Sequence, residues 1–170
     1  MMARTFIIVA GIVLATAIVV ALVQGGGTTS GEDLETITAP SFTLTDLESG
    51  DELTLESYAG EPLVIHFFAS WCALCTGTAQ SIAGYADEAE FNVLLVAVDS
   101  RESDADLIGF KERIGRDSWR VARLTPDVER SYAVRSLDTK YVIDADGAIS
   151  HSDNRAWRAG EAARFIGDVV

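Results

Sequence analysis

The longest feature of the hydropathy pattern is an unbroken apolar run over residues 5–23. It holds no charged residue and only two threonines, so it lacks the polar stripe of a helix on a soluble domain. As a helix it would extend roughly 28 Å at about 1.5 Å per residue, enough to cross the hydrocarbon core of a bilayer. The run therefore predicts a transmembrane anchor.

Charge around the run predicts its orientation. Arg4 is the only charged residue before it, and acidic residues dominate after it. The positive-inside rule then places residues 1–4 in the cytoplasm and the rest of the chain outside. A cleaved secretory signal is the alternative, although its apolar region is usually shorter, about 7–15 residues. Both interpretations put the remainder of the chain outside the cytoplasm.

Residues 24–39 are rich in Gly, Ser and Thr and show no apolar periodicity, which indicates a flexible linker. Pro40 marks the expected start of a folded domain over residues 40–170. Polar and apolar residues alternate over 41–45 and again over 52–55, and the Gly-containing turn between them predicts a β-hairpin.

Two continuous apolar runs, residues 63–68 and 91–98, have strand length and suit central strands covered on both faces. Helical spacing is expected over 76–90 and 104–114, and a short helix should begin at Pro126 with Thr125 as its N-cap. The remaining expected elements are a strand at 119–122, a hairpin of 141–143 and 148–150 turning at 144–147, and a last helix over 161–170. Alternating strands and helices predict an α/β three-layer domain.

Cys72 and Cys75 are the only cysteines, and they follow the first buried run directly. A Cys-x-x-Cys pair between a strand and a helix suits thiol–disulfide exchange, because the helix N-terminus stabilises a thiolate on the first cysteine. Cys72 would attack a substrate disulfide, and Cys75 would resolve the mixed disulfide. A static disulfide remains an alternative. Zinc is disfavoured, since His66 and His151 are the only histidines and no zinc-like spacing exists.

The formal net charge is −13, with 26 acidic and 13 basic residues. No basic patch exists, so nucleic-acid binding is disfavoured. An acidic surface poor in lysine keeps a protein soluble at high salt. The composition is similar to that of halophilic archaea, and an ordinary acidic extracytoplasmic domain fits it equally well.

The folded part resembles the thioredoxin superfamily, and most closely its membrane-anchored TlpA/ResA-type thiol–disulfide oxidoreductases. The resemblance rests on Ala-Ser-Trp-Cys-x-x-Cys at 69–75, Val96-x-Val98, and Tyr132-x-Val134 leading to Tyr-Val-Ile-Asp-x-Asp-Gly at 141–147. It implies a thioredoxin-like fold with a central mixed sheet and catalysis by the two cysteines, with no cofactor and no bound metal. Trp71 would form part of the apolar rim around the reactive sulfur.

The chain departs from this family at three places. Asp138, followed by Thr139, stands where the family has a cis-proline whose neighbouring backbone binds substrate. A non-proline cis bond costs about 3–4 kcal/mol, so this loop is expected to be trans or rearranged. The Asp138 carboxylate would raise the thiol pKa if it lay near the sulfurs, and otherwise it would be a solvated loop residue. Thr78 replaces a proton-handling glutamate, and Ala73-Leu74 gives Cys72 no positive partner.

Asp138 and Thr139 are thus the expected substrate-binding positions beside Trp71. His66 could contribute if its side chain faces the cysteines, although a packed neutral histidine is the more ordinary interpretation. Two other functions stay open. One is a Sco-type Cu(I) chaperone for a respiratory oxidase, in which Ser136 occupies the place of the third ligand. The other is a redox-inert binding module of the same fold.

The expected partners are protein thiols and disulfides, with apocytochrome c, a copper-site subunit and general secreted proteins all open. The direction of electron flow depends on thiolate stabilisation that no motif fixes. The sequence indicates neither the protein substrate nor the oligomeric state.

Overall fold

The computed structural model describes residues 37–170. The predicted anchor, residues 5–23, and most of the predicted linker lie outside this part of the chain. Among the described residues, none of the helices has the length and apolar character that a membrane crossing needs. The folded part begins earlier than the predicted Pro40, because Ala39 is buried and its N–H donates to the Gly147 carbonyl at 2.9 Å.

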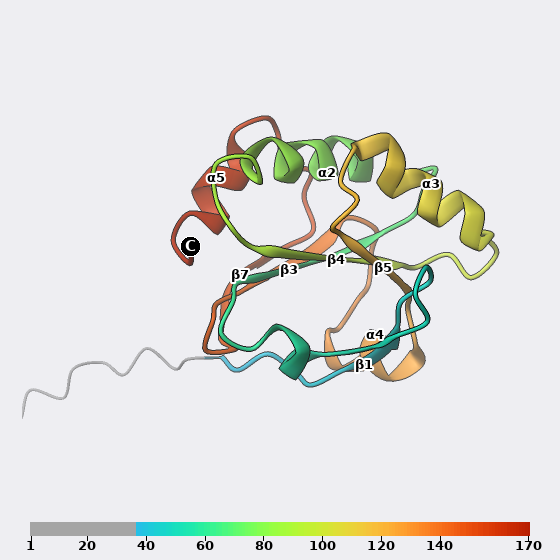
Figure 1. Cartoon of the computed structure of the whole chain (residues 1–170), viewed down its shortest axis with the longest axis horizontal. Helices are drawn as coiled ribbons and strands as arrows, with labels where there is room; N and C mark the ends of the chain where they lie inside the picture. The colour runs from blue at the N-terminus through green and yellow to red at the C-terminus, as the bar shows by residue number, and fades with distance from the viewer. Residues whose placement is uncertain (1–36) are drawn as a thin grey trace, which may run out of the picture. The chain divides into compact units, whose positions relative to one another are not determined.

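A five-stranded mixed sheet forms the centre of the described part (Figure 1), with strand order β5-β4-β3-β6-β7. β3 (Leu63–Phe68), β4 (Asn92–Ala97) and β5 (Arg120–Arg123) run parallel. β6 (Thr139–Ile143) pairs antiparallel with β3, and β7 (Ile149–Asp153) pairs antiparallel with β6. The central mixed sheet predicted for the domain is confirmed.

Helices α2 (Ala73–Tyr85), α3 (Asp104–Ile114) and α5 (Glu161–Ile166) cover one face of the sheet. The other face carries the hairpin of β1 (Thr43–Thr45) and β2 (Glu52–Thr54), the 3-10 turn η1 (Leu55–Tyr58) and α4 (Pro126–Ser131), as Figure 1 shows. Each face has its own apolar cluster. This is the three-layer arrangement that the alternation of strands and helices predicts.

Side chains of β3 alternate between the two faces because successive residues of a strand point in opposite directions. Val64 and Phe68 belong to the cluster beneath α2, whereas Ile65 and Phe67 belong to the opposite cluster. The same alternation directs His66, which is fully buried, toward α2. A polar ring therefore lies within an apolar strand on the side of the cysteines.

Several local predictions agree with the observed elements. The hairpin pairs β1 with β2, α3 has the expected bounds, and Thr125 caps α4 by accepting from the Val128 N–H, with Pro126 in its first turn. Other bounds differ. α2 spans Ala73–Tyr85 rather than 76–90, with Cys72 itself as its N-cap, and α5 ends at Ile166 rather than at the last residue. β5 begins one residue later than predicted, and β7 continues to Asp153.

Candidate active site

Cys72 is the N-cap of α2, at the point where β3 and its following loop meet the helix. Its backbone is extended, and its Sγ accepts a hydrogen bond from the Cys75 N–H at 3.1 Å. Cys72 and Cys75 form a disulfide. Cys72 retains 8% exposure and Cys75 none, so an incoming group can reach only the first sulfur. The helix N-terminus and its free N–H groups favour a thiolate there once the disulfide is reduced.

Two large apolar side chains lie exposed beside this sulfur. Trp71 is 62% exposed and Leu74 is 65% exposed. The Trp71 Nε1–H donates to Asp99 Oδ2 at 3.2 Å, which holds the indole against the loop after β4. Hydrogen bonds from the Arg101 side chain and backbone keep the pKa of Asp99 well below its usual value, so this anchor stays ionised. Trp71 is exposed, as a rim residue must be, and its part in an apolar rim around the sulfur stays a prediction.

Asp138 occupies the loop that enters β6, with φ 63°, in the left-handed region. Residues 37–170 contain no cis peptide bond, so the prediction of a trans loop is confirmed. The Asp138 N–H donates to the Phe67 carbonyl at 2.9 Å. Proline fits neither feature, because its φ is fixed near −65° and it has no N–H. Aspartate and asparagine tolerate the left-handed region better than most residues do.

The Asp138 side chain is buried, with 2% of the residue exposed, so the alternative of a solvated loop residue is wrong. His66 Nε2 lies 2.8 Å from Asp138 Oδ1, and the Thr78 hydroxyl donates to Asp138 Oδ2 at 3.0 Å. Thr78 in turn accepts from the Trp157 N–H at 2.9 Å. The position that lacks the family's glutamate therefore holds the loop carboxylate in place.

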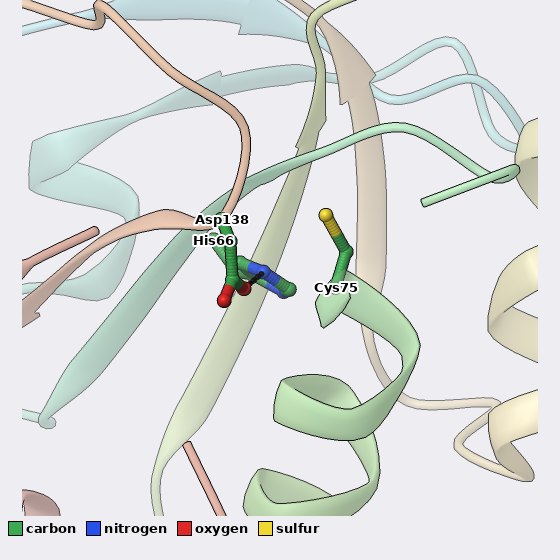
Figure 2. Close-up of side chains that lie close together, drawn as sticks. All are labelled: His66, Cys75 and Asp138. Carbon is green, nitrogen blue, oxygen red and sulfur yellow. Dashed lines mark hydrogen bonds and ion pairs between the residues drawn. The ribbon is translucent and has the colours of Figure 1, made fainter. Parts of the chain in front are cut away.

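His66 and Asp138 lie side by side, facing the start of α2, where Cys75 lies (Figure 2). One polar atom from each of His66, Cys75 and Asp138 lies within 4.8 Å of the other two. All three residues are buried. The sheet creates this proximity, since β6 pairs with β3 with Lys140 opposite His66.

Burial lowers the pKa of His66 below its usual value, and the hydrogen bond to Asp138 offsets this only in part. The imidazole is therefore neutral at physiological pH. A neutral ring facing a carboxylate places its proton on Nε2, so we assign an Nε2–H that donates to Asp138. Nδ1 has no hydrogen-bond partner within residues 37–170.

Lys140 is a buried cation behind the carboxylate, with no exposed surface. Its ammonium donates to the carbonyls of Asp138 and Arg155, each at 2.7 Å, and lies 3.9 Å from Asp138 Oδ2. It also forms an ion pair with Asp153 Oδ1 at 2.7 Å. Burial alone would raise the pKa of Asp153, but hydrogen bonds from Lys140, Trp157 and His151 outweigh it and lower that pKa to about 2.

The cluster of His66, Cys75 and Asp138 does not fit a resident metal ion. The Cys75 sulfur is covalently bonded to Cys72, His66 Nε2 is hydrogen-bonded to Asp138 Oδ1, and Asp138 Oδ2 accepts from Thr78. Ser136, at the third-ligand position of the copper chaperones, is exposed and accepts from the Asn154 amide. The geometry therefore adds no support to the copper-chaperone alternative.

The model of the AhpC/TSA family matches residues 37–152, more than half of the chain. The chain belongs to the AhpC/TSA family. Thiol-disulfide oxidoreductase ResA of Geobacillus thermodenitrificans is 31% identical over 113 residues, which are 66% of this chain and 64% of that protein. ResA of Bacillus anthracis is 28% identical over 112 residues, 65% and 64% of the two chains. The match thus spans just under two thirds of these curated relatives.

Among solved structures, the thiol:disulfide interchange protein of the thioredoxin family from Chlorobium tepidum superposes with a TM-score of 0.70. It is 21% identical and covers 81% of this chain and 98% of that chain. At this identity the likeness shows the fold alone, and it confirms the predicted thioredoxin-like α/β fold. The predicted homology to ResA-type proteins is confirmed by the curated relatives.

Within this AhpC/TSA-family domain, the predicted site residues have different surroundings. Trp71 is exposed and Cys72 retains 8% exposure, whereas the side chain of Asp138 is buried near Cys75. Thr139 is also buried, and its hydroxyl donates to the Ser136 carbonyl at 2.8 Å. Substrate binding by Trp71, Asp138 and Thr139 stays a prediction.

Sequence reasoning missed Lys140 and gave His66 little weight. The available signal was alternation along β3, which puts His66 on the same face as Val64 and Phe68. The missing information was the register of β3 against β6, which no local pattern specifies.

Proposed function

We propose that this protein is a membrane-tethered, extracytoplasmic thiol–disulfide oxidoreductase that reduces disulfides or oxidises thiols of other proteins. The observation that carries the proposal is the disulfide between a partly exposed Cys72 at a helix N-terminus and a fully buried Cys75. The ResA relatives are named for the same activity. The apolar run over residues 5–23 supports the tether, with the catalytic domain outside.

In the reductive direction, the Cys72 thiolate attacks a disulfide of the substrate protein and forms a mixed disulfide, and one substrate thiolate leaves. Cys75 then attacks Cys72 Sγ and releases the second substrate thiolate. Trp71 and Leu74 offer apolar surface on which a protein substrate can rest while its sulfur reaches Cys72. The oxidative direction uses the same steps in reverse.

A purely structural role for the disulfide is the weaker alternative. The cross-link spans a sequence separation of 3. A disulfide that closes so short a loop restricts the unfolded chain least, so it is a poor means of stabilising a fold. Its first cysteine retains 8% exposure and lies close in the chain to the exposed Trp71 and Leu74, which suits exchange with a partner instead.

The activity is tested by equilibrating the full-length protein, in detergent, with dithiothreitol and glutathione buffers. We expect reversible two-electron reduction of Cys72–Cys75 with a potential between about −270 and −120 mV, the range of thioredoxin-like catalysts. The Cys72→Ser/Cys75→Ser double variant controls for other reducible groups. A disulfide that resists reduction down to about −300 mV would be a structural one and would remove the proposal.

The topology is tested in intact cells with a membrane-impermeant thiol reagent applied after mild reduction. We expect Cys72 to be labelled without lysis and the protein to remain in the membrane fraction, because the apolar run serves as an uncleaved anchor. The Cys72→Ser variant controls for labelling specificity. Labelling only after lysis would contradict the extracytoplasmic placement, and recovery in the soluble fraction would contradict the anchor.

A further inference from the structure

The resolving step needs a proton acceptor. Cys75 has no exposed surface, so its thiol cannot hand its proton directly to bulk water. Burial also disfavours the thiolate that must attack Cys72. A group next to the Cys75 sulfur must therefore take the proton as the new disulfide forms.

We propose that the Asp138 carboxylate is this proton acceptor, held in position by His66 and Thr78. The inference rests on the proposed function and assigns a catalytic group to its second step. Asp138 and His66 each place a polar atom within 4.8 Å of the Cys75 sulfur in the oxidised protein. Catalytic hydrogen bonds are often longer in a resting structure than in the reacting complex.

The step balances as follows. The Cys75 S–H proton moves to an Asp138 oxygen, and the sulfur's electron pair forms the bond to Cys72 Sγ. The bond between Cys72 and the substrate sulfur breaks, and the substrate thiolate leaves with the electron pair of that broken bond. Cys72 and Cys75 are oxidised to the disulfide, and the substrate is reduced. Asp138 afterwards returns its proton to solvent or, in the reverse direction, to the Cys75 thiolate.

The charges around Asp138 favour a shared proton. A thiolate at Cys75 and a carboxylate at Asp138 would repel each other in a buried cluster, so the pair holds one negative charge more readily than two. Transfer from sulfur to oxygen keeps that single charge constant. The Lys140 ammonium, 3.9 Å from Oδ2, balances it, while Asp153 in turn neutralises part of Lys140.

Two hydrogen-bond donors orient the Asp138 carboxylate. From β3, His66 donates its Nε2–H to Oδ1, and burial lowers the pKa of this ring, which keeps it a neutral donor. From α2, the Thr78 hydroxyl donates to Oδ2. Both bonds orient the carboxylate, and each oxygen retains a lone pair that can receive the thiol proton.

The test is single-turnover reduction of 5,5′-dithiobis(2-nitrobenzoate) by the reduced full-length protein. Attack by Cys72 releases the first coloured thiolate, and resolution by Cys75 releases the second, so two phases report the two steps separately. In Asp138→Asn we expect the second phase to slow ten- to hundredfold at pH 7, while the first phase stays within about twofold of the wild type. Asparagine preserves the size and the left-handed backbone at this position.

The pH profile separates proton transfer from a merely structural role. A rising pH increases the fraction of Cys75 thiol that ionises by slow exchange with solvent and so bypasses the acceptor. The ratio of wild-type to Asp138→Asn second-phase rates should therefore shrink as the pH rises from 7 to 10. The exposed Asp127→Asn variant on α4 is the matched control, with both phases unchanged. A slowing that is equal at every pH, or a second phase of wild-type rate, would overturn the inference while leaving the first step intact.

His66→Gln provides a second route if Asp138→Asn does not fold. The glutamine amide can still donate to the carboxylate, so we expect a second phase slowed by less than about tenfold relative to the wild type at pH 7, with the difference from the wild type shrinking at high pH. A His66→Gln second phase of wild-type rate, or one slowed equally at every pH, would overturn the assignment of the acceptor. Absence of a first phase in the wild type would instead remove the proposed function itself.

Discussion

Replacing Cys75 with serine is expected to convert the protein into a trap for its substrates. Cys72 can still attack a disulfide, because the residue retains 8% exposure and the helix N-terminus is unchanged. The mixed disulfide then persists, since no second thiol is present to resolve it. Multiple-turnover exchange should fall at least about a hundredfold, because the covalent route is interrupted.

Cys72→Ser is the matched comparison. It loses exchange to the same extent, but it should trap nothing, because Cys75 is fully buried and no substrate sulfur can reach it. The measurement is non-reducing electrophoresis of membranes quenched with N-ethylmaleimide, followed by mass spectrometry of the adducts. Equal trapping by both variants would show that Cys75 is accessible, and trapping by Cys72→Ser alone would reverse the two roles.

Much of the fold is predictable because its signals are local. Continuous apolar runs mark β3 and β4, alternation marks the β1–β2 hairpin, and Ser103 and Gly115 bound the helix α3 by its caps. Such patterns depend on burial and backbone geometry within a few residues. The Cys-x-x-Cys pair is equally local, so its place at the end of a central strand also follows from the sequence.

The polar network below the disulfide is not predictable in this way. His66 and Asp138 are separated by 72 positions, and only the pairing of β3 with β6 brings them together. Aspartate in a loop is ordinarily solvated, and its burial here depends on three partners from three elements: His66, Thr78 and Lys140. A hydropathy pattern contains no information on the register of two paired strands. It also does not show which hydrogen bonds will compensate for the burial of a carboxylate.

Lys140 carries the largest expected effect on stability. The ammonium is fully buried, and it is the cation between Asp138 and Asp153. Lys140→Met keeps the length and apolar stem of the side chain but removes the charge, leaving buried carboxylate and carbonyl oxygens without their donor. Breaking a buried ion pair in this way costs about 3–5 kcal/mol of unfolding free energy.

Arg130→Met is the control for this variant. Arg130 pairs with Asp127 on α4, but the two side chains are 72% and 89% exposed, so the pair is screened by solvent. We expect its loss to change the unfolding free energy by less than about 0.5 kcal/mol. Both variants are compared with the wild type by urea unfolding followed through tryptophan fluorescence. A loss below about 1 kcal/mol in Lys140→Met would show that the network tolerates an uncompensated charge.

The pH dependence of the same measurement gives an independent check. The folded-state pKa of Asp153 is lowered to about 2, because its hydrogen bonds outweigh the effect of burial. An unfolded aspartate titrates near 3.9, so the wild type should lose the stabilisation from Asp153 as the pH falls from about 4 through 2. His66 has a separate effect at higher pH: because its pKa is lower in the folded state, the unfolded state binds a proton first, and the free energy of unfolding decreases as the pH falls below about 6.5. Lys140→Met should show a shallower loss between pH 4 and 2, because Asp153 no longer has the cation that keeps it ionised. An unchanged slope there would mean that the other partners of Asp153, which are Trp157, His151 and Arg155, keep it ionised without Lys140.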